Sequence, residues 1–197
     1  MMTLPKEASA MTRAEFLAWE ETQLTKHEFV GGEVFAMVGA RQIHVITTLN
    51  IAAMLKAHLR GRPCRALISD MQLEVESADA VLYPDVMVTC DSRDLRAERT
   101  LCHPLVVIEV LSESTAAYDR GQKFALYRQI DALQEYALVD PEQRTVEVFR
   151  RTETGDWLLA TRDSERGLVL RSLEFEAPLT RVFEDVEATE EQPPTVE

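Results

Sequence analysis

The segment that limits the fold most is 105–111 (LVVIEVL), in which every residue except Glu109 is apolar. A strand buried on one face alternates apolar and polar residues, whereas a strand covered on both faces is apolar throughout. We therefore expect 105–111 to lie in the middle of a covered sheet. A carboxylate is costly to bury unless it is paired, protonated or bound to a metal. Glu109 is thus either a residue of a functional site or a residue on a semi-exposed face of the sheet, and the sequence of this segment alone does not distinguish these two roles.

Shorter patterns predict the elements around this strand. Residues 12–22 predict a helix, with Thr12 as N-cap and Glu15 at the capping-box position, and 27–38 predict a hairpin that turns at Gly31-Gly32. Helical spacing predicts helices at 42–60 and 118–130. Further strands are predicted at 64–76, with a break at Ser69-Asp70, and at 83–90, 135–139, 145–151 and 157–161. This order favours an α/β fold, a mixed sheet with helices on both faces.

Length and charge set the domain organisation. The 197 residues fit one domain, which we expect at 12–186, between a flexible N-terminus (1–11) and an acidic disordered tail (187–197). There is no apolar run long enough to span a bilayer and no signal-peptide pattern, so we predict a cytoplasmic protein that does not contact membranes. The net charge of −13 opposes a protein that coats nucleic acid electrostatically. A nuclease of this charge would need a metal ion and local arginines to hold phosphate.

Three cysteines, Cys64, Cys90 and Cys102, lack the paired short spacing that a zinc site requires. Cys64 and Cys90 lie in apolar, strand-like stretches. A reduced cysteine in such a place behaves as a small apolar residue, and we predict that role for both.

Two acids and one lysine are the candidate catalytic residues. Asp85 follows Pro84 at the head of a predicted strand, and the next strand contains Glu109. Adjacent strands that each offer one inward acid suit Mg²⁺, which takes one or two carboxylates plus waters and substrate phosphate. Lys123 is notable because the chain has four Lys among its 21 basic residues, and an ammonium is a compact charge that differs from a guanidinium. The alternative for Lys123 is an exposed helical ion pair with Asp119.

Read together, the segments YPDVMV, VIEVLSEST, YDRGQKFALYRQI and EYALVD resemble the Uma-type (Uma-two) endonuclease family. The resemblance covers about residues 12–186. It implies a restriction-endonuclease-like mixed β-sheet core flanked by helices, with an extra N-terminal hairpin and C-terminal strands. The signature of that superfamily, PD-(D/E)XK, matches Pro84-Asp85 and Glu109, but Leu111 stands where its lysine is expected. The resemblance implies that Lys123 supplies the amine from the following helix.

The resemblance further implies a Mg²⁺-dependent endodeoxyribonuclease that acts on DNA. Asp85 and Glu109 would hold Mg²⁺ or Mn²⁺, and Lys123 would orient the attacking water or stabilise developing charge. Further candidates to line the site are Glu33, His44, Asp70, Asp119 and Tyr127. Candidate phosphate contacts are Arg60, Arg62, Arg65, Arg120 and Arg128. A homodimer is expected by analogy with nucleases that cut two strands.

Two other functions compete with this one. The acidic charge and the displaced lysine favour a binding or regulatory module that keeps the nuclease fold with little or no turnover. A glycosidase with two carboxylates ranks last, because it gives Lys123 no role and the chain has only two tryptophans to line a sugar cleft.

Overall fold

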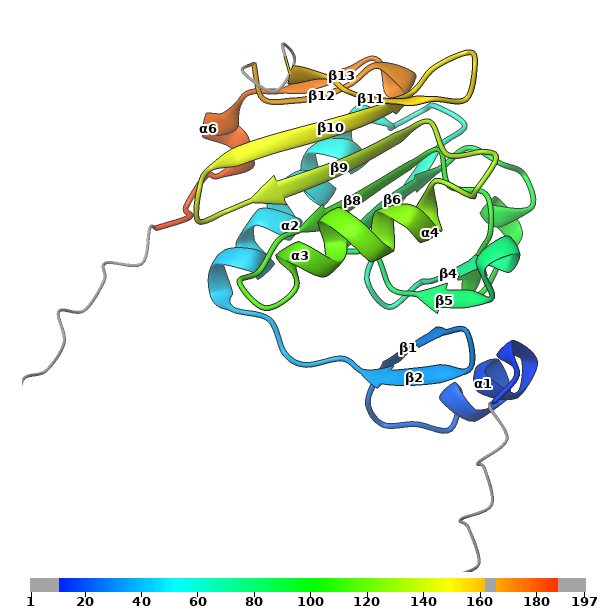
Figure 1. Cartoon of the computed structure of the whole chain (residues 1–197). Coiled ribbons are helices and arrows are strands. Elements are labelled where there is room, and N and C mark those ends of the chain that lie inside the picture. The colour runs from blue at the N-terminus through cyan, green and yellow to red at the C-terminus, as the bar shows by residue number, and fades with distance from the viewer. Residues whose placement is uncertain (1–10, 162–165, 188–197) are drawn as a thin grey trace, which may run out of the picture.

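The computed structural model describes residues 11–161 and 166–187. The predicted flexible N-terminus and acidic tail lie outside these residues, except for Met11 and Glu187 at their borders. The central element is a six-stranded sheet with the order β11-β10-β9-β8-β6-β3 (Figure 1). Its strands are β3 (Arg65–Ile68), β6 (Val86–Thr89), β8 (Val106–Val110), β9 (Glu135–Asp140), β10 (Thr145–Arg151) and β11 (Trp157–Leu159).

Strand β8 occupies the middle of this sheet, as its apolar sequence predicts. It pairs antiparallel with β6 and parallel with β9, and all five of its residues are buried. Helix α2 (Gln42–His58) packs Ile51 and Leu55 against one face of the sheet. The helical segment 116–127 packs Tyr127 against the other face. The predicted mixed sheet with helices on both faces is therefore confirmed.

A second sheet carries the N-terminal hairpin. Its order is β2-β1-β5-β4-β7, and its strands are β1 (His27–Val30), β2 (Glu33–Ala36), β4 (Gln72–Val75), β5 (Ala80–Leu82) and β7 (Thr100–Leu101). The hairpin turns at Gly31 and Gly32, which have φ of 56° and 95°, values that suit glycine in a tight turn. Helix α1 (Arg13–Glu20) begins with the predicted capping box. Figure 1 shows the hairpin at the base of the molecule.

The predicted strand at 64–76 is interrupted at Ser69-Asp70, as the sequence predicts. Residues before the break form β3 in the six-stranded sheet, and residues after it form β4 in the other sheet. Asp70, at the break, has a φ of 126°, which an L-residue rarely adopts. This turn therefore transfers the chain from one sheet to the other.

The helix predicted at 118–130 forms as three consecutive pieces. These are α3 (Ala116–Tyr118), the π-helical turn η3 (Asp119–Lys123) and α4 (Phe124–Tyr127). A π turn widens the helix by one residue and often occurs at functional sites. Asp119, Lys123 and Tyr127 are all buried here, so this segment turns three polar side chains toward the sheet.

The C-terminal part completes the core. Strands β12 (Leu168–Leu170) and β13 (Phe175–Ala177) form a two-stranded sheet, followed by α6 (Leu179–Val182). Short 3-10 turns η1 (Glu76–Ala78), η2 (Asp94–Arg96) and η4 (Arg171–Leu173) lie between strands.

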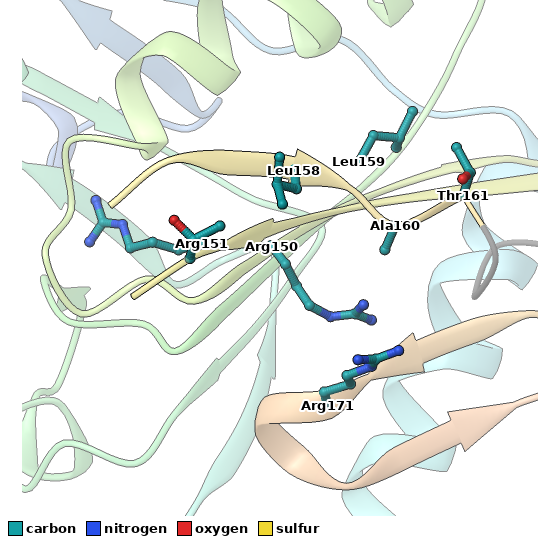
Figure 2. A pocket seen from close by; sticks show the side chains of 8 residues that line it. Arg150, Arg151, Leu158, Leu159, Ala160, Thr161 and Arg171 are labelled. Atoms are coloured by element: carbon teal, nitrogen blue, oxygen red, sulfur yellow. The ribbon is translucent and has the colours of Figure 1, made fainter. Parts of the chain in front are cut away.

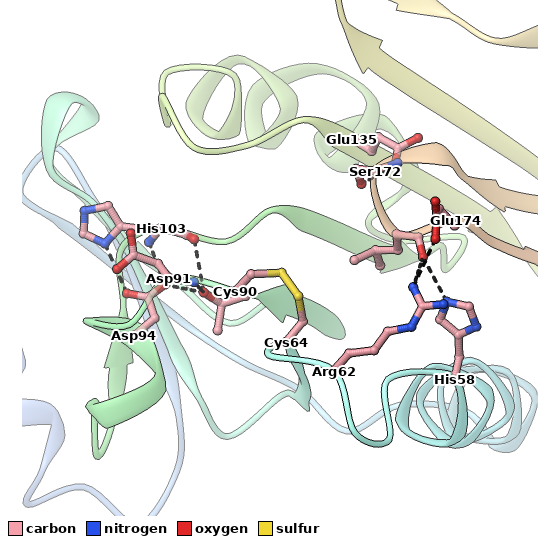
Figure 3. Close-up of a disulfide and its surroundings, with 12 residues drawn as sticks. His58, Arg62, Cys64, Cys90, Asp91, Asp94, His103, Glu135, Ser172 and Glu174 are labelled. Atoms are coloured by element: carbon pink, nitrogen blue, oxygen red, sulfur yellow. Dashed lines mark hydrogen bonds and ion pairs between the residues drawn. A yellow bond between two sulfur atoms is a disulfide. The ribbon is translucent and has the colours of Figure 1, made fainter.

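The prediction that Cys64 and Cys90 are reduced is wrong, because the two residues are joined by a disulfide (Figure 3). Antiparallel pairing of β3 with β6 sets Arg65 opposite Thr89, so the next residue pair outward is Cys64 and Cys90.

Within the described residues, no helix combines the length and the apolar composition needed to cross a bilayer.

Candidate active site

Asp85 and Glu109 meet at the end of the β6–β8 pair. Val86 is paired with Ile108, so one step outward Asp85 lies opposite Glu109 and their side chains share a face. The Asp85 backbone N–H donates to Glu109 Oε2 over 3.3 Å, and the Val110 N–H donates to Asp85 Oδ2 over 2.8 Å. The two acids predicted from adjacent strands are thus neighbours.

Lys123 and Tyr127 reach Glu109 from the helical segment. The Lys123 Nζ donates to Glu109 Oε1 over 3.1 Å, and the Tyr127 hydroxyl donates to the same oxygen over 2.7 Å. Glu109 is 3% exposed, so these donors, together with the Asp85 N–H, explain how a carboxylate is accommodated in an apolar strand.

Lys123 is held by two further carboxylates. Its Nζ lies 2.9 Å from Glu28 Oε1 and 3.8 Å from Asp119 Oδ1. Glu28 comes from strand β1 and also accepts a hydrogen bond from the Tyr83 N–H. Sequence reasoning missed Glu28, because an acid in the short hairpin strand HEFV gives no sign of its partner. The Gly31-Gly32 turn sets which residues of the hairpin are paired, but it does not show that Glu28 contacts Lys123.

The cluster of Glu28, Asp85, Glu109, Asp119 and Lys123 carries more negative than positive charge. Burial is the main cause that raises the pKa of Glu109, and together with the opposing Lys123 ammonium and the added repulsion of the Asp85 and Asp119 carboxylates it brings this pKa to about 8. Burial also raises the pKa of Asp119. Burial lowers the pKa of Lys123, but the surrounding carboxylates outweigh this effect and the net shift is upward. A cation beside the acids would relieve their mutual repulsion.

His44 lies on the other side of Asp85. It stands in the first turn of α2, and its Nε2 is 3.2 Å from Asp85 Oδ2. Burial lowers the pKa of His44, but the hydrogen bond and charge of Asp85 shift it upward overall. This contact, with the Val110 N–H, fixes the orientation of the Asp85 carboxylate.

The donor set of Asp85 and Glu109 fits a hard divalent cation. Asp85 is 16% exposed at its side chain, and among the described residues none hydrogen-bonds to its Oδ1. Across residues 11–161 and 166–187, no group of three or more His, Cys, Asp and Glu side chains forms a ready metal cage. Mg²⁺ does not require one, since it commonly binds one or two carboxylates and keeps several waters.

Two predicted acids lie apart from this cluster. Glu33 is exposed at the turn end of the hairpin, opposite Val30. Asp70 is exposed and forms an ion pair with Lys26. Asp119, His44 and Tyr127, in contrast, all contact a member of the cluster.

The candidate phosphate contacts are not gathered at the cluster. Arg60 follows the C-terminal end of α2, about 24 Å from His44 at 1.5 Å per helical residue. Arg62 donates to the Leu173 carbonyl (Figure 3), and Arg65 donates to the Leu95 carbonyl.

The two arginines of the helical segment are also directed elsewhere. Arg120 pairs with Glu147 at 3.1 Å and Asp140 at 3.8 Å. Arg128 is exposed just beyond α4, and its carbonyl accepts from Arg151. Among the described residues, none of these five arginines forms an ion pair or hydrogen bond with a member of the acid cluster, and their role as phosphate contacts stays a prediction.

A cavity of about 440 Å³ lies elsewhere, between β10, β11 and the start of η4 (Figure 2). Its lining includes Arg150, Arg151 and Arg171. Arg150 donates to the buried Glu135 over 2.6 Å, and Arg151 donates to the carbonyls of Asp131 and Arg128. Arg150 and Arg151 thus contact residues of the sheet and of the turn before β9, and we place the candidate site at the acid cluster.

Comparisons with known proteins identify relatives of this chain. Two uncharacterized proteins of Synechocystis sp. (strain ATCC 27184 / PCC 6803 / Kazusa) are similar. The protein slr1290 is 36% identical over 159 residues, 81% of this chain and 84% of its own length. The protein sll1609 is 35% identical over 151 residues, 76% of this chain and 85% of its own length.

A solved structure shares the fold. It is the crystal structure titled "a putative nuclease belonging to DUF820" from Anabaena variabilis ATCC 29413, with a TM-score of 0.71 and 19% identity over 88% of this chain and 97% of that chain. The family model described as "Putative restriction endonuclease" matches residues 13–180, which include every member of the acid cluster. The chain therefore belongs to the Uma2 family, as the motifs around Asp85, Glu109 and Lys123 predict.

Proposed function

We propose that this protein is a metal-dependent endonuclease that hydrolyses DNA phosphodiester bonds. The observation that carries the proposal is the contact between Asp85, Glu109 and Lys123, which come from three separate elements. Glu109 lies 3.3 Å from the Asp85 N–H and 3.1 Å from Lys123 Nζ. Buried charges are costly to maintain, and ionisable groups with shifted pKa values are enriched at functional sites.

Asp85 and Glu109 are the residues proposed to hold Mg²⁺ or Mn²⁺. When bound, the cation would polarise the scissile phosphate and lower the pKa of a water molecule. His44 acts as a positioning residue, because it holds the Asp85 carboxylate through Oδ2 and leaves Oδ1 available. Tyr127 likewise positions Glu109 through Oε1.

Lys123 is proposed to act as a fixed positive charge. Three carboxylates surround its Nζ, so the ammonium form is favoured over the neutral amine that a general base would need. An ammonium at this place would stabilise the negative charge that develops on the phosphate, or orient the attacking water. Lys123 thus replaces the lysine that Leu111 displaces from the usual motif.

Cleavage of supercoiled plasmid and of single-stranded DNA tests the proposal. The variants are Asp85→Asn and Glu109→Gln, with Glu33→Gln as a control because Glu33 is an exposed acid outside the cluster. We expect the wild type and Glu33→Gln to cleave in Mg²⁺ or Mn²⁺ and not in EDTA, and both cluster variants to lose at least about 100-fold. Cleavage that persists in Asp85→Asn and Glu109→Gln would contradict the assignment.

A binding or regulatory module is the second candidate. Leu111, at the usual lysine position, is 3% exposed, and within the described residues the hydrogen-bond and ion-pair partners of Lys123 Nζ are all acids. If the wild type binds DNA but cleaves none in either metal, this second function is the correct one.

A further inference from the structure

Phe35, on the hairpin strand β2, is an unusual side chain in this molecule. It is 47% exposed, and among the described residues with exposed large apolar side chains it is the one aromatic. Most other rings are packed: Phe124, for example, contacts Tyr136, Phe149 and Trp157. Among the described residues no aromatic ring packs against Phe35, and nearly half of the residue is exposed to solvent.

The hairpin register sets Phe35 beside the acid cluster. Phe35 is paired with Glu28, so the two side chains lie on the same face of the hairpin, with Cβ atoms about 5 Å apart. Glu28 is the residue whose Oε1 lies 2.9 Å from Lys123 Nζ. Phe35 is therefore one strand further out than Glu28, on the side where Lys123 lies.

Tyr118 supplies a second ring at this place. It ends helix α3, is half-buried, and its ring centre lies 5.9 Å from Lys123 Nζ. Within the described residues, the contacts of Lys123 Nζ are thus three acids and one aromatic ring, and none adds positive charge.

Three basic residues on or next to the elements that carry the cluster are paired with acids. Lys26 pairs with Asp70, Arg41 pairs with Glu142 at 2.5 Å, and Arg120 pairs with Glu147. Affinity for duplex DNA comes mainly from Lys and Arg contacts to phosphate, and the chain as a whole carries a net charge of −13. Stacking of bases on aromatic rings is a source of affinity that needs no such contacts.

We propose that Phe35 is a stacking platform for an unpaired nucleobase next to the acid cluster, so that this protein prefers single-stranded DNA to duplex DNA. A base within a duplex is stacked on its neighbours and cannot offer its face to Phe35. An unpaired base can stack on the ring while the adjoining phosphate approaches Asp85 and Glu109. The inference rests on the proposed nuclease function, because it names the substrate class of that site.

Binding measured without metal separates this inference from the nuclease activity. The probes are a fluorescein-labelled 12-nucleotide oligothymidylate and a duplex of equal length, followed by fluorescence anisotropy in EDTA at several salt concentrations. The variants are Phe35→Ala and Phe35→Trp. Val34→Ala is the matched control, because Val34 is the next residue of β2 and its side chain lies on the opposite face.

We expect the single strand to bind more tightly than the duplex, with a shallow dependence on salt. Phe35→Ala should weaken binding of the single strand roughly 5- to 150-fold, the range for loss of one base–aromatic stack. Phe35→Trp should restore it, and Val34→Ala should leave it unchanged. Circular dichroism melts are expected to be alike for the three variants.

Three results would overturn the inference. They are equal or tighter binding of the duplex, unchanged binding in Phe35→Ala, and no binding of either probe. Sedimentation in the same buffer adds a further test: if Phe35→Ala converts a dimer to a monomer with DNA binding unaltered, Phe35 belongs to a protein interface. Intact single-strand binding without cleavage in Mg²⁺ or Mn²⁺ would instead refute the nuclease function and leave the stacking role standing.

Discussion

Breaking the Cys64–Cys90 disulfide is expected to destabilise the protein by about 3.5 kcal/mol. The bridge closes a segment in which the two cysteines are 26 residues apart. A cross-link over a loop of this length removes about 12 cal/mol/K of chain entropy from the unfolded state, which at 25 °C amounts to about 3.5 kcal/mol. The native state changes little, because antiparallel pairing of β3 with β6 already sets the two residues opposite each other.

Urea unfolding followed by tryptophan fluorescence, with and without dithiothreitol, measures this difference. Reduction should lower the midpoint of unfolding, and the melting temperature should fall by roughly 7 to 14 °C for a chain of this size. Cys64→Ser should show the same loss and should no longer respond to dithiothreitol. Cys102→Ser is the control, because Cys102 is a free thiol.

A loss below about 1 kcal/mol on reduction would refute the entropic reasoning. An equal loss in Cys102→Ser would show that thiol removal in general, and not the bridge, is responsible. Retention of a dithiothreitol response in Cys64→Ser would show that another pair of cysteines forms the disulfide.

Three further predictions concern the charge cluster and the C-terminal strands. Lys123→Met should lower the free energy of unfolding by about 3 to 5 kcal/mol in urea titrations, because it leaves three buried carboxylates without their cation; a loss below about 1 kcal/mol would contradict the ion pairs. Burial raises the pKa of Glu109 to about 8 and a metal ligand must be deprotonated, so Mn²⁺ affinity should fall by up to about tenfold per pH unit as pH drops below 8. Calorimetry that finds the same affinity at pH 6 and pH 9 would contradict this. A Cβ at Gly167 would lie 2.1 Å from the Ala177 carbonyl oxygen, where one at Gly39 meets nothing within 4 Å. Gly167→Ala should therefore cost at least about 2 kcal/mol in urea and Gly39→Ala less than about 1, and equal losses would refute the steric argument.

Much of the fold follows from local patterns. The apolar run around Glu109 indicates a central strand, and β8 lies in the middle of the six-stranded sheet with helices packed on both faces. The capping box at Thr12 and the Gly31-Gly32 turn also form as predicted. These features are encoded within a few neighbouring residues, so reading the chain in short windows detects them.

Features that depend on partners distant in sequence were harder to predict. The disulfide was missed because Cys64 and Cys90 lie on separate strands, and only the register of β3 with β6 brings them opposite each other. Glu28 is not singled out by the sequence for a similar reason: it is an acid of a short hairpin strand, and tertiary packing alone decides that it reaches Lys123. The candidate arginines were chosen by charge, and the fold uses Arg62 and Arg65 to hold loop carbonyls.

The most direct test of the central claim is calorimetric titration of the protein with Mn²⁺ at pH 8 in the absence of DNA. Asp85→Asn, Glu109→Gln and the control Asp70→Asn are compared with the wild type, since Asp70 is an exposed acid that pairs with Lys26 outside the cluster. We predict saturable binding in the wild type and in Asp70→Asn, and its loss in Asp85→Asn and Glu109→Gln. Binding that survives in both cluster variants, or that disappears in Asp70→Asn, would contradict a metal site at Asp85 and Glu109.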